Sequence, residues 1–258
     1  DGMVGDRSWA IRDETRSQIE GARKLPGLLE CEAHFVDIVE PGSTLPVPQI
    51  TLPDGTQIAA DAKDLPKRLT EFLGCDVTIW PRVDASNSTH YERAPFESSD
   101  MTAELRNVFA RLEDEPLPDL GKLPPESLMA ATLPGTYFDC FPIMLMSTTA
   151  LDSLAAARPA SQFDRRRFRA NFVVDVGQGD GFPENEWIGK NLRIGEAVFE
   201  MATECPRCVM TTHAQNELPK DPGIMRALVQ ENGGNLGVYA RVATPGLIRE
   251  GDAVEITG

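Results

Sequence analysis

The feature that most constrains the fold is a succession of short runs rich in β-branched or aromatic residues, each bounded by glycine or proline. Turn-forming sequences such as Pro53-Asp-Gly55, Gly233-Gly234 and Glu250-Gly-Asp252 separate several of these runs. Many strands and few helices predict a mainly β fold, built of β-barrels with a few peripheral helices. The runs expected to form strands are 33–39, 77–80, 171–176, 197–202, 236–242 and 253–257.

Three segments carry helix signals. The first has one apolar stripe at i, i+3, i+4 and i+7, formed by Leu105, Val108, Phe109 and Leu112. A second helix is expected near Thr149, which forms a capping-box pattern with Asp152. A third should begin at Asp221, an N-cap followed by proline, and end at Gly233.

A proline-rich stretch divides the chain. Residues 116–125 contain four prolines, and proline fits neither the interior of a helix nor a central strand. We therefore expect a connector there and two domains, residues 1–126 and 127–258. The net charge is −12 over residues 1–150 and −3 over residues 151–258, so the second part would tolerate an anionic ligand better.

The composition disfavours several partners. With 25 Lys and Arg against 40 Asp and Glu, neither nucleic acid nor an anionic membrane surface is an expected partner. The longest apolar stretch, around residues 143–146, is far shorter than the roughly 20 residues of a membrane-spanning helix. Five cysteines without a signal-peptide pattern fit a reduced, cytoplasmic protein. The chain opens at Asp1 as if inside a domain, so we expect a missing segment upstream.

Cys205 and Cys208 form a Cys-x-x-Cys motif with four possible interpretations. A structural zinc site would need two further ligands, whereas the other cysteines are isolated and the three histidines lack metal-ligand spacing. A thioredoxin-like pair would open a helix, whereas Thr211-Thr212 indicates a loop. The pair could also be two core cysteines. Finally, one thiolate could serve as a metal ligand or nucleophile, with its pKa lowered by Arg207.

Residues 165–169 contain four arginines just before an expected strand. Such a run is either a solvated basic loop or an anion clamp, since guanidinium groups bind phosphate through paired hydrogen bonds. Strand-like alternation would direct Arg167 and Arg169 to one side and Phe168 to the other. Asn171 could then add a directed amide.

Four segments together resemble a MOSC domain: 167–175, 187–195, 237–252 and the sequence Cys205-Pro-Arg-Cys-Val-Met-Thr-Thr212. Their order and spacing match over about residues 135–258. Upstream, 4–9, 73–77 and 136–142 resemble the N-terminal β-barrel that precedes this domain in a subset of proteins. That subset includes the mitochondrial amidoxime-reducing component, and the MOSC domain is also the C-terminal part of molybdenum-cofactor sulfurases.

The resemblance implies a pterin molybdenum cofactor between the two domains, with Cys208 as metal ligand and catalytic residue. With Asn171 added as the directed amide, the positions expected around the pterin and its phosphate are Arg7, Asp139, Phe141, Arg169, Asn171, Arg207 and Tyr239. Two features depart from the family pattern. The family's phosphate-binding Lys-Ser pair would precede Asp1, and residues 213–219 replace the acidic stretch that often follows the Thr-Thr pair.

The resemblance thus predicts an oxidoreductase that reduces N-hydroxylated or related small molecules. Electrons would come from a separate protein, because the chain has no Gly-rich nucleotide fingerprint and too few cysteines for an iron–sulfur cluster. The alternatives are a sulfur carrier that uses a Cys208 persulfide and a non-catalytic binding module. Pyridoxal phosphate belongs to sulfurase partners fused to the domain, and no lysine motif assigns it to this chain.

Overall fold

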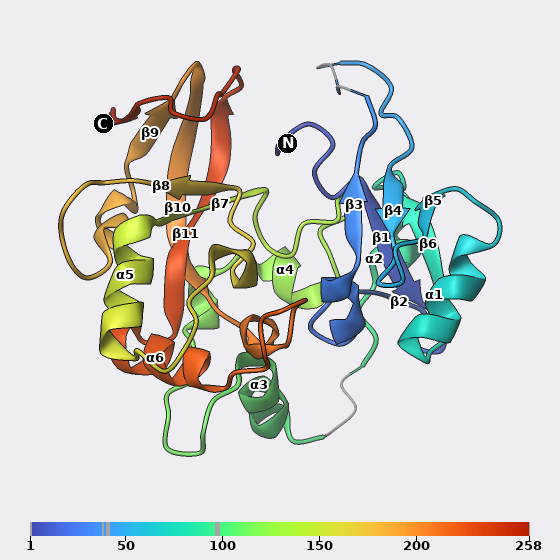
Figure 1. The fold of residues 1–258 in the computed structure, drawn as a ribbon, viewed down its shortest axis with the longest axis horizontal. Helices are drawn as coiled ribbons and strands as arrows, with labels where there is room; N and C mark the ends of the chain where they lie inside the picture. Colours follow the sequence, from blue (N-terminus) through green and yellow to red (C-terminus); the bar gives the residue numbers. More distant parts are fainter. Residues whose placement is uncertain (1, 38, 40–41, 96–98, 258) are drawn as a thin grey trace.

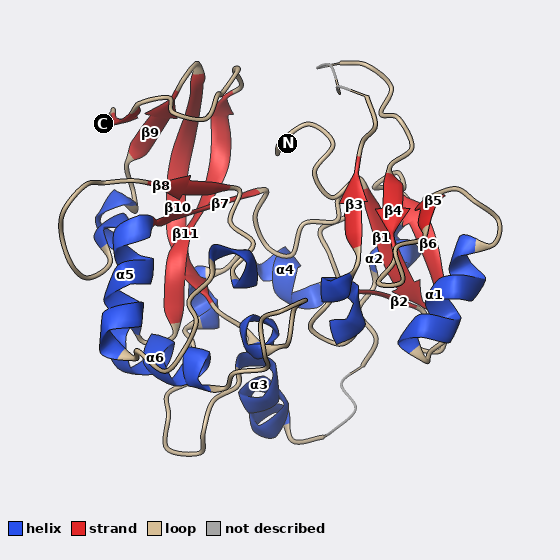
Figure 2. Ribbon diagram, in the orientation of Figure 1, coloured by secondary structure: helices blue, strands red, loops and turns tan. Residues whose placement is uncertain are grey.

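The computed structural model describes residues 2–37, 39, 42–95 and 99–257. Their strands form one six-stranded sheet and two three-stranded sheets, which lie in two halves side by side (Figure 1). The expected mainly β fold is confirmed, and the large sheet curls into a half-barrel with few helices around it (Figure 2). No helix among the described residues is long and apolar enough to cross a membrane.

Short strands and short helices alternate along the whole chain. The strands are β1 (Trp9–Asp13), β2 (Gln18–Glu20), β3 (Glu32–His34), β4 (Gln49–Thr51), β5 (Gln57–Ala59), β6 (Val77–Pro81), β7 (Ile143–Ser147), β8 (Phe172–Val174), β9 (Asn191–Ile194), β10 (Ala197–Pro206), β11 (Asn235–Thr244) and β12 (Val254–Ile256). The α-helices are α1 (Leu65–Leu73), α2 (Ser88–Tyr91), α3 (Met101–Phe109), α4 (Pro125–Met129), α5 (Thr148–Ala157) and α6 (Gly223–Asn232). The 3₁₀ helices are η1 (Pro26–Glu30), η2 (Leu120–Lys122), η3 (Arg165–Arg167), η4 (Pro183–Trp187) and η5 (Val209–Thr212).

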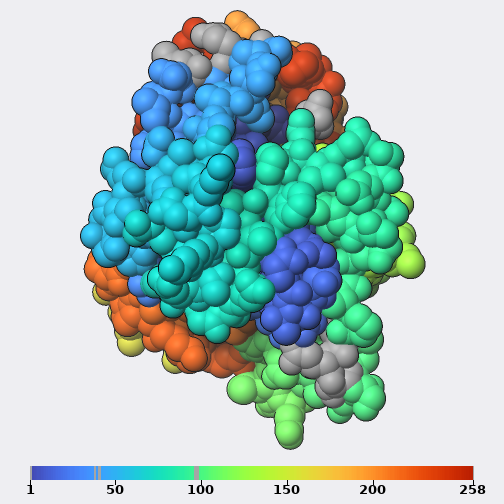
Figure 3. All heavy atoms as spheres, turned by 90° about the vertical axis from the view of Figure 1, so that its right-hand side faces the viewer, coloured from blue at the N-terminus to red at the C-terminus, as the bar shows by residue number. Residues whose placement is uncertain are grey.

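The large sheet has the order β12-β9-β10-β11-β7-β8, in which only the β7–β8 pair is parallel. The small sheets have the orders β2-β1-β6 and β3-β4-β5, and all their pairs are antiparallel. Seen from the side of the small sheets, the first part of the chain covers most of the molecule and the C-terminal part emerges at its margins (Figure 3).

Several sequence expectations need correction. The run at 33–39 forms a strand only at Glu32–His34, and position 38 lies outside the described residues. Helix α3 ends at Phe109 because Ala110 adopts a left-handed backbone (φ 48°), so Leu112 lies beyond the helix. Helix α5 is capped by Ser147 rather than Thr149, through its side chain and the Ala150 N–H (3.0 Å). Helix α6 ends at left-handed Gly233 (φ 58°), as expected.

Strand β7 is buried along its whole length and supplies two cores. Ile143 and Leu145 point into the core inside the curl of the large sheet. Met144 and Met146 point into the core on the other face, which α5 and α6 cover. This alternation explains why a short apolar run without polar residues is a strand in this protein: both of its faces need apolar side chains.

A carboxyl group lies inside the curl of the large sheet. Glu184 is fully buried, and its Oε2 accepts a hydrogen bond from the Ser147 hydroxyl (2.5 Å). Burial raises the pKa of Glu184, and the bond from Ser147 opposes this rise only in part. Because Ser147 also caps α5, Glu184 connects η4 to the start of that helix.

We expect Glu184→Gln to flatten the pH dependence of stability. The folded-state pKa of this carboxyl is above its unfolded value, so its contribution is fully present below the unfolded pKa and is lost as pH rises through the folded pKa. The wild-type free energy of unfolding should therefore fall with rising pH from about 4.5 upwards more steeply than that of the variant. Urea unfolding between pH 5 and 8 measures this difference, and identical slopes would contradict it.

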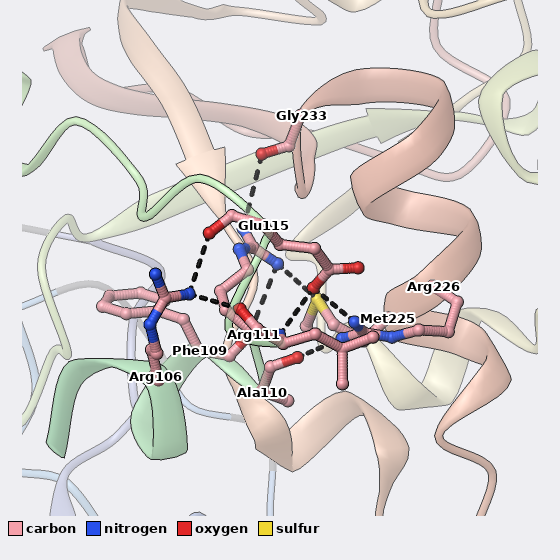
Figure 4. Close-up of polar contacts among 9 residues, drawn as sticks. Arg106, Phe109, Ala110, Arg111, Glu115, Met225, Arg226 and Gly233 are labelled. Atoms are coloured by element: carbon pink, nitrogen blue, oxygen red, sulfur yellow. Dashed lines mark hydrogen bonds and ion pairs between the residues drawn. The ribbon is translucent and has the colours of Figure 1, made fainter. Parts of the chain in front are cut away.

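The segment ahead of the proline-rich stretch is anchored to α6 (Figure 4). Arg111 is buried and donates hydrogen bonds to the Met225 sulfur (2.8 Å) and the Gly233 carbonyl (3.4 Å). Arg226 forms an ion pair with Glu115. The part of the chain before residue 126 therefore already packs against the second half, and the division at residue 126 remains a prediction.

Candidate functional site

The Cys-x-x-Cys motif lies where β10 ends and η5 begins. Cys205 is 2% exposed, whereas Cys208 is half-buried and has an extended backbone ahead of η5. The Thr211 hydroxyl donates to the Cys208 carbonyl (3.0 Å), and the Thr212 hydroxyl donates to the Val209 carbonyl (2.7 Å). The Thr-Thr pair thus stabilises the turn that carries Cys208.

A β-bulge determines which way Cys205 points. Strand β10 has one extra residue, Ala202, between the pairs Met201↔Ala240 and Thr203↔Tyr239. Met201 lies in the core inside the curl, whereas Cys205, four residues on, lies in the opposite core. Without the bulge both side chains would share one face, because the side-chain period of a strand is two.

Arg207 is buried and holds the motif together. Its Nη1 donates to the Cys205 sulfur (3.0 Å) and its Nη2 donates to the Phe168 carbonyl (2.6 Å), while its backbone N–H donates to Gly234 (2.9 Å). The guanidinium also lies over the Phe168 ring, 5.5 Å from its centre. Its Nε is buried without a hydrogen-bond partner among the described residues.

The expected lowering of the Cys208 pKa is wrong. Burial raises the pKa of the Cys208 thiol, and the Asp139 carboxylate adds to the rise. Arg207 opposes it but does not prevail, because its Nη groups are directed at Cys205 and Phe168. The positive charge of Arg207, expected beside Cys208, therefore lies beside the Cys205 sulfur instead.

Arg7 and Arg169 both adopt left-handed backbones, with φ of 49° and 53°. A residue other than glycine there costs about 1 kcal/mol or more, so the surrounding structure must hold both positions. Arg169 is exposed at the mouth of the site, yet the protein around it displaces water and lowers the pKa of its guanidinium. Arg7 lowers that pKa further, which places the two arginines within electrostatic reach of each other.

Asn171 has a structural role in addition to its position beside the site. Its side-chain carbonyl accepts from the Met144 N–H (2.9 Å) and its own N–H donates to the Met144 carbonyl (2.9 Å). Its amide nitrogen donates to the Asp6 carboxylate (3.2 Å). The amide expected to contact an anion thus fixes the loop that carries Arg7.

The arginine run separates into different roles, because residues 165–167 form η3 rather than a strand. Arg166 forms ion pairs with Asp164 (2.8 Å) and Glu217 (2.6 Å). Arg167 is buried and donates to the carbonyls of His213 (2.9 Å) and Pro219 (2.7 Å). The expectation that Arg167 and Arg169 share one side is wrong, and only Arg169 reaches Arg7.

Asp139, Phe141 and Tyr239 complete the predicted set. The rings of Phe141 and Tyr239 stack with centres 5.0 Å apart and an interplanar angle of 17°. Burial raises the pKa of Tyr239 well above its ordinary value. Asp139 is exposed and acts electrostatically on Cys208, Arg169 and Tyr239. The structure thus brings the predicted residues into one region.

Two residues of this region carry no sequence prediction. Asp6 directly precedes the predicted residue Arg7 in the 4–9 segment, and this adjacency could have identified Asp6 as a candidate. Arg23 acts electrostatically on Cys208, and its carbonyl contacts His213 Nε2 (3.3 Å). The sequence around Arg23 offers no such signal.

The described residues contain no group of three or more His, Cys, Asp or Glu side chains that could hold a metal ion by themselves. The zinc interpretation therefore has no support in this part of the chain. A metal at Cys208 would instead need ligands from a bound cofactor. The fold and the site define a β-rich protein in which a half-buried thiol, Cys208, lies near Arg207, and in which Arg7 and Arg207 lie within electrostatic reach of Arg169.

Comparison with known proteins is consistent with this class. Residues 132–255 match the MOSC domain family. Over 107 residues the chain is 32% identical to mitochondrial amidoxime reducing component 2 of Bos taurus, a match that covers 42% of this chain and 28% of the relative. Among solved structures, YiiM from Geobacillus stearothermophilus is 18% identical (TM-score 0.36, 46% of this chain and 55% of that chain). YiiM from Escherichia coli is 16% identical (TM-score 0.35, 46% and 55%).

The chain therefore contains a MOSC domain at residues 132–255. Its match spans less than a third of the bovine relative's length and about half of the length of the YiiM chains.

Proposed function

We propose that this MOSC protein binds a pterin molybdenum cofactor and is an oxidoreductase. The observation that carries the proposal is that Arg207 lies within electrostatic reach of both the Cys208 thiol and Arg169, and that Arg7 lies within reach of Arg169. None of these three arginines forms an ion pair with a carboxylate among the described residues. An anionic ligand would supply the missing partner.

The residues present fit such a group. Arg207 has a buried Nε without a partner, and charged side chains are seldom buried unless they are paired. Three guanidinium groups against two nearby carboxylates, Asp6 and Asp139, leave an excess of positive charge. The strained backbones of Arg7 and Arg169 are typical of side chains held in place for a ligand.

In this proposal Cys208 holds the metal, and the arginines hold the anionic end of the pterin. Phe141 and Tyr239 form the aromatic wall beside it. The cofactor would supply the redox chemistry when bound, and the protein would supply the thiolate and the anion site. The raised pKa of Cys208 means that the thiol gives up a proton when the metal binds.

The proposed substrate is a small N-hydroxylated or related molecule. Support comes from the name of the bovine relative, an amidoxime reducing component. We further propose that electrons come from a separate protein and that the protein works in the cytoplasm. Residues 213–219, whose carbonyls Arg167 fixes, border Cys208 and would influence substrate choice.

The test is metal analysis of the full chain, produced in a host that synthesises the molybdenum cofactor. About one molybdenum per chain, with reduction of an amidoxime by a chemical electron donor, would support the proposal. Protein without molybdenum would refute it. A cyanide-labile sulfur on Cys208 in its place would favour the sulfur-carrier alternative.

Arg169→Lys should reduce molybdenum content although it keeps the positive charge. Lysine lacks the planar fork that binds phosphate through two parallel hydrogen bonds, and one charge-assisted hydrogen bond contributes roughly 1.5–3 kcal/mol. We expect about tenfold weaker retention during dialysis. Arg165→Lys, at an exposed position of the same run, is the matched control. Unchanged retention in Arg169→Ala would make this arginine a solvated surface residue.

A further inference from the structure

A groove of about 340 Å³ opens beside the stacked pair of Phe141 and Tyr239. One wall is the backbone and apolar side chains of residues 123–125, and the other contains Ala202, the extra residue of the β10 bulge. Arg241 and Glu126 also line it. The volume suits a small organic molecule rather than a single ion.

Arg241 is the polar feature that gives this groove a charge preference. Its guanidinium carbon lies 4.8 Å from the centre of the Phe141 ring, so the group is stacked on that face. It forms no hydrogen bond or ion pair with any described residue, and the side chain is exposed. Stacking fixes the guanidinium plane and leaves its N–H edge available, which is the geometry that binds a carboxylate through two parallel hydrogen bonds.

The other charges around the groove restrict the ligand further. Lys122 is engaged in an ion pair with Glu204 (2.9 Å), whose second oxygen accepts from the Thr203 hydroxyl (3.1 Å). Glu126 is exposed and unneutralised at the groove. One available cation faces one carboxylate, so a dianion such as phosphate would be repelled more than a single carboxylate.

We propose that this groove binds a small aromatic monocarboxylate. The carboxylate pairs with the Arg241 guanidinium, and the ring packs against residues 123–125. Binding itself does not depend on the cofactor. Because Phe141 borders both sites, the groove would also select substrates that carry a carboxylate, and this second step rests on the proposed function.

The test uses fluorobenzoate as the probe and fluorine NMR of the full chain, first as purified without molybdenum. The wild type should bind it, and Arg241→Gln should weaken binding about tenfold. Arg241→Lys should give an intermediate affinity because it keeps the charge without the fork. Arg249→Gln, at an exposed arginine outside the groove, should leave binding unchanged. Thermal unfolding of each variant confirms that it is folded.

Equal binding by wild type and Arg241→Gln would overturn the proposal, as would equal binding of neutral fluorobenzamide. Competition by inorganic phosphate at a similar concentration would also overturn it, because the groove would then hold any anion. If fluorobenzoate binds as expected while protein from a cofactor-producing host contains no molybdenum, the groove stands and the proposed function fails. If fluorobenzoate does not bind while protein from that host contains molybdenum, the groove proposal fails and the proposed function stands.

Discussion

Cys208→Ser protein should lose nearly all of its molybdenum while its free energy of unfolding stays within about 1 kcal/mol of the wild type. Cys208 is half-buried, and the turn around it is held by backbone carbonyls and the hydroxyls of Thr211 and Thr212, which the substitution leaves in place. Only the metal ligand is removed. Metal analysis and urea unfolding of protein from the same cofactor-producing host measure both quantities.

Two matched variants sharpen this result. Cys75→Ser replaces another partly exposed thiol, in the core of the small sheets, and should retain the metal. Cys205→Ser should lose part of it, because the serine oxygen replaces the sulfur that accepts from Arg207. Equal and complete loss in Cys205→Ser and Cys208→Ser would instead indicate a paired role, such as a zinc site or a disulfide.

Arg207→Leu should both destabilise the protein and abolish cofactor retention. The substitution leaves the buried Phe168 carbonyl without its donor and the Cys205 sulfur without its charged neighbour. A buried acceptor without a donor costs about 1–3 kcal/mol, so we expect a total loss of roughly 2–4 kcal/mol. In a chain of this size, each kcal/mol lowers Tm by about 2–4 °C. Calorimetry and urea unfolding provide the measurement.

The control for this variant is Arg165→Leu, which removes an exposed arginine of the neighbouring run. Its stability should stay within about 0.5 kcal/mol of the wild type. Arg207→Leu protein that is as stable as the wild type would mean that relief from burying a charge offsets the lost hydrogen bonds. The predicted destabilisation would then be wrong, and retention alone would report on the cofactor site.

The sequence predicted which residues of the candidate site would be neighbours, and their role as a site stays a prediction. Motif order placed Cys208, Arg207 and Tyr239 together, and the structure brings them into one region with Arg7 and Arg169. These residues lie in segments whose chemistry is local, such as the Thr-Thr pair after Cys208. Such local motifs can be identified in the sequence without knowledge of the tertiary structure.

What the sequence could not predict is orientation. Because Arg207 directly precedes Cys208, we expected its positive charge to act on that thiol. Its guanidinium instead donates to the Cys205 sulfur and the Phe168 carbonyl. Likewise, strand-like alternation failed at Arg167 because the segment turns into η3, whose first N–H groups are capped by Asp164. Left-handed backbones at Arg7 and Arg169 leave no mark in residue type, since arginine has no preference for them.

The short strands of the first part were also difficult to predict. Strands β2, β3, β4 and β5 have three residues each, too few for an alternating pattern to stand out from a loop. Strand β7 was not predicted for the opposite reason, because a continuous apolar run has no alternation of apolar and polar residues. The structure of β7 depends on β8 and β11, which are distant in the chain.

The extra residue in β10 makes the length of this strand as important as its composition. Deleting Ala202 would remove this bulge and turn the side chains that follow it in β10 to the opposite face. Cys205 would then point into the core inside the curl, and the turn that presents Cys208 would begin on the wrong side of the sheet. Substitutions at Ala202 should therefore be tolerated far better than insertions or deletions between Met201 and Cys205, so natural variation in this stretch should alter residues without altering their number.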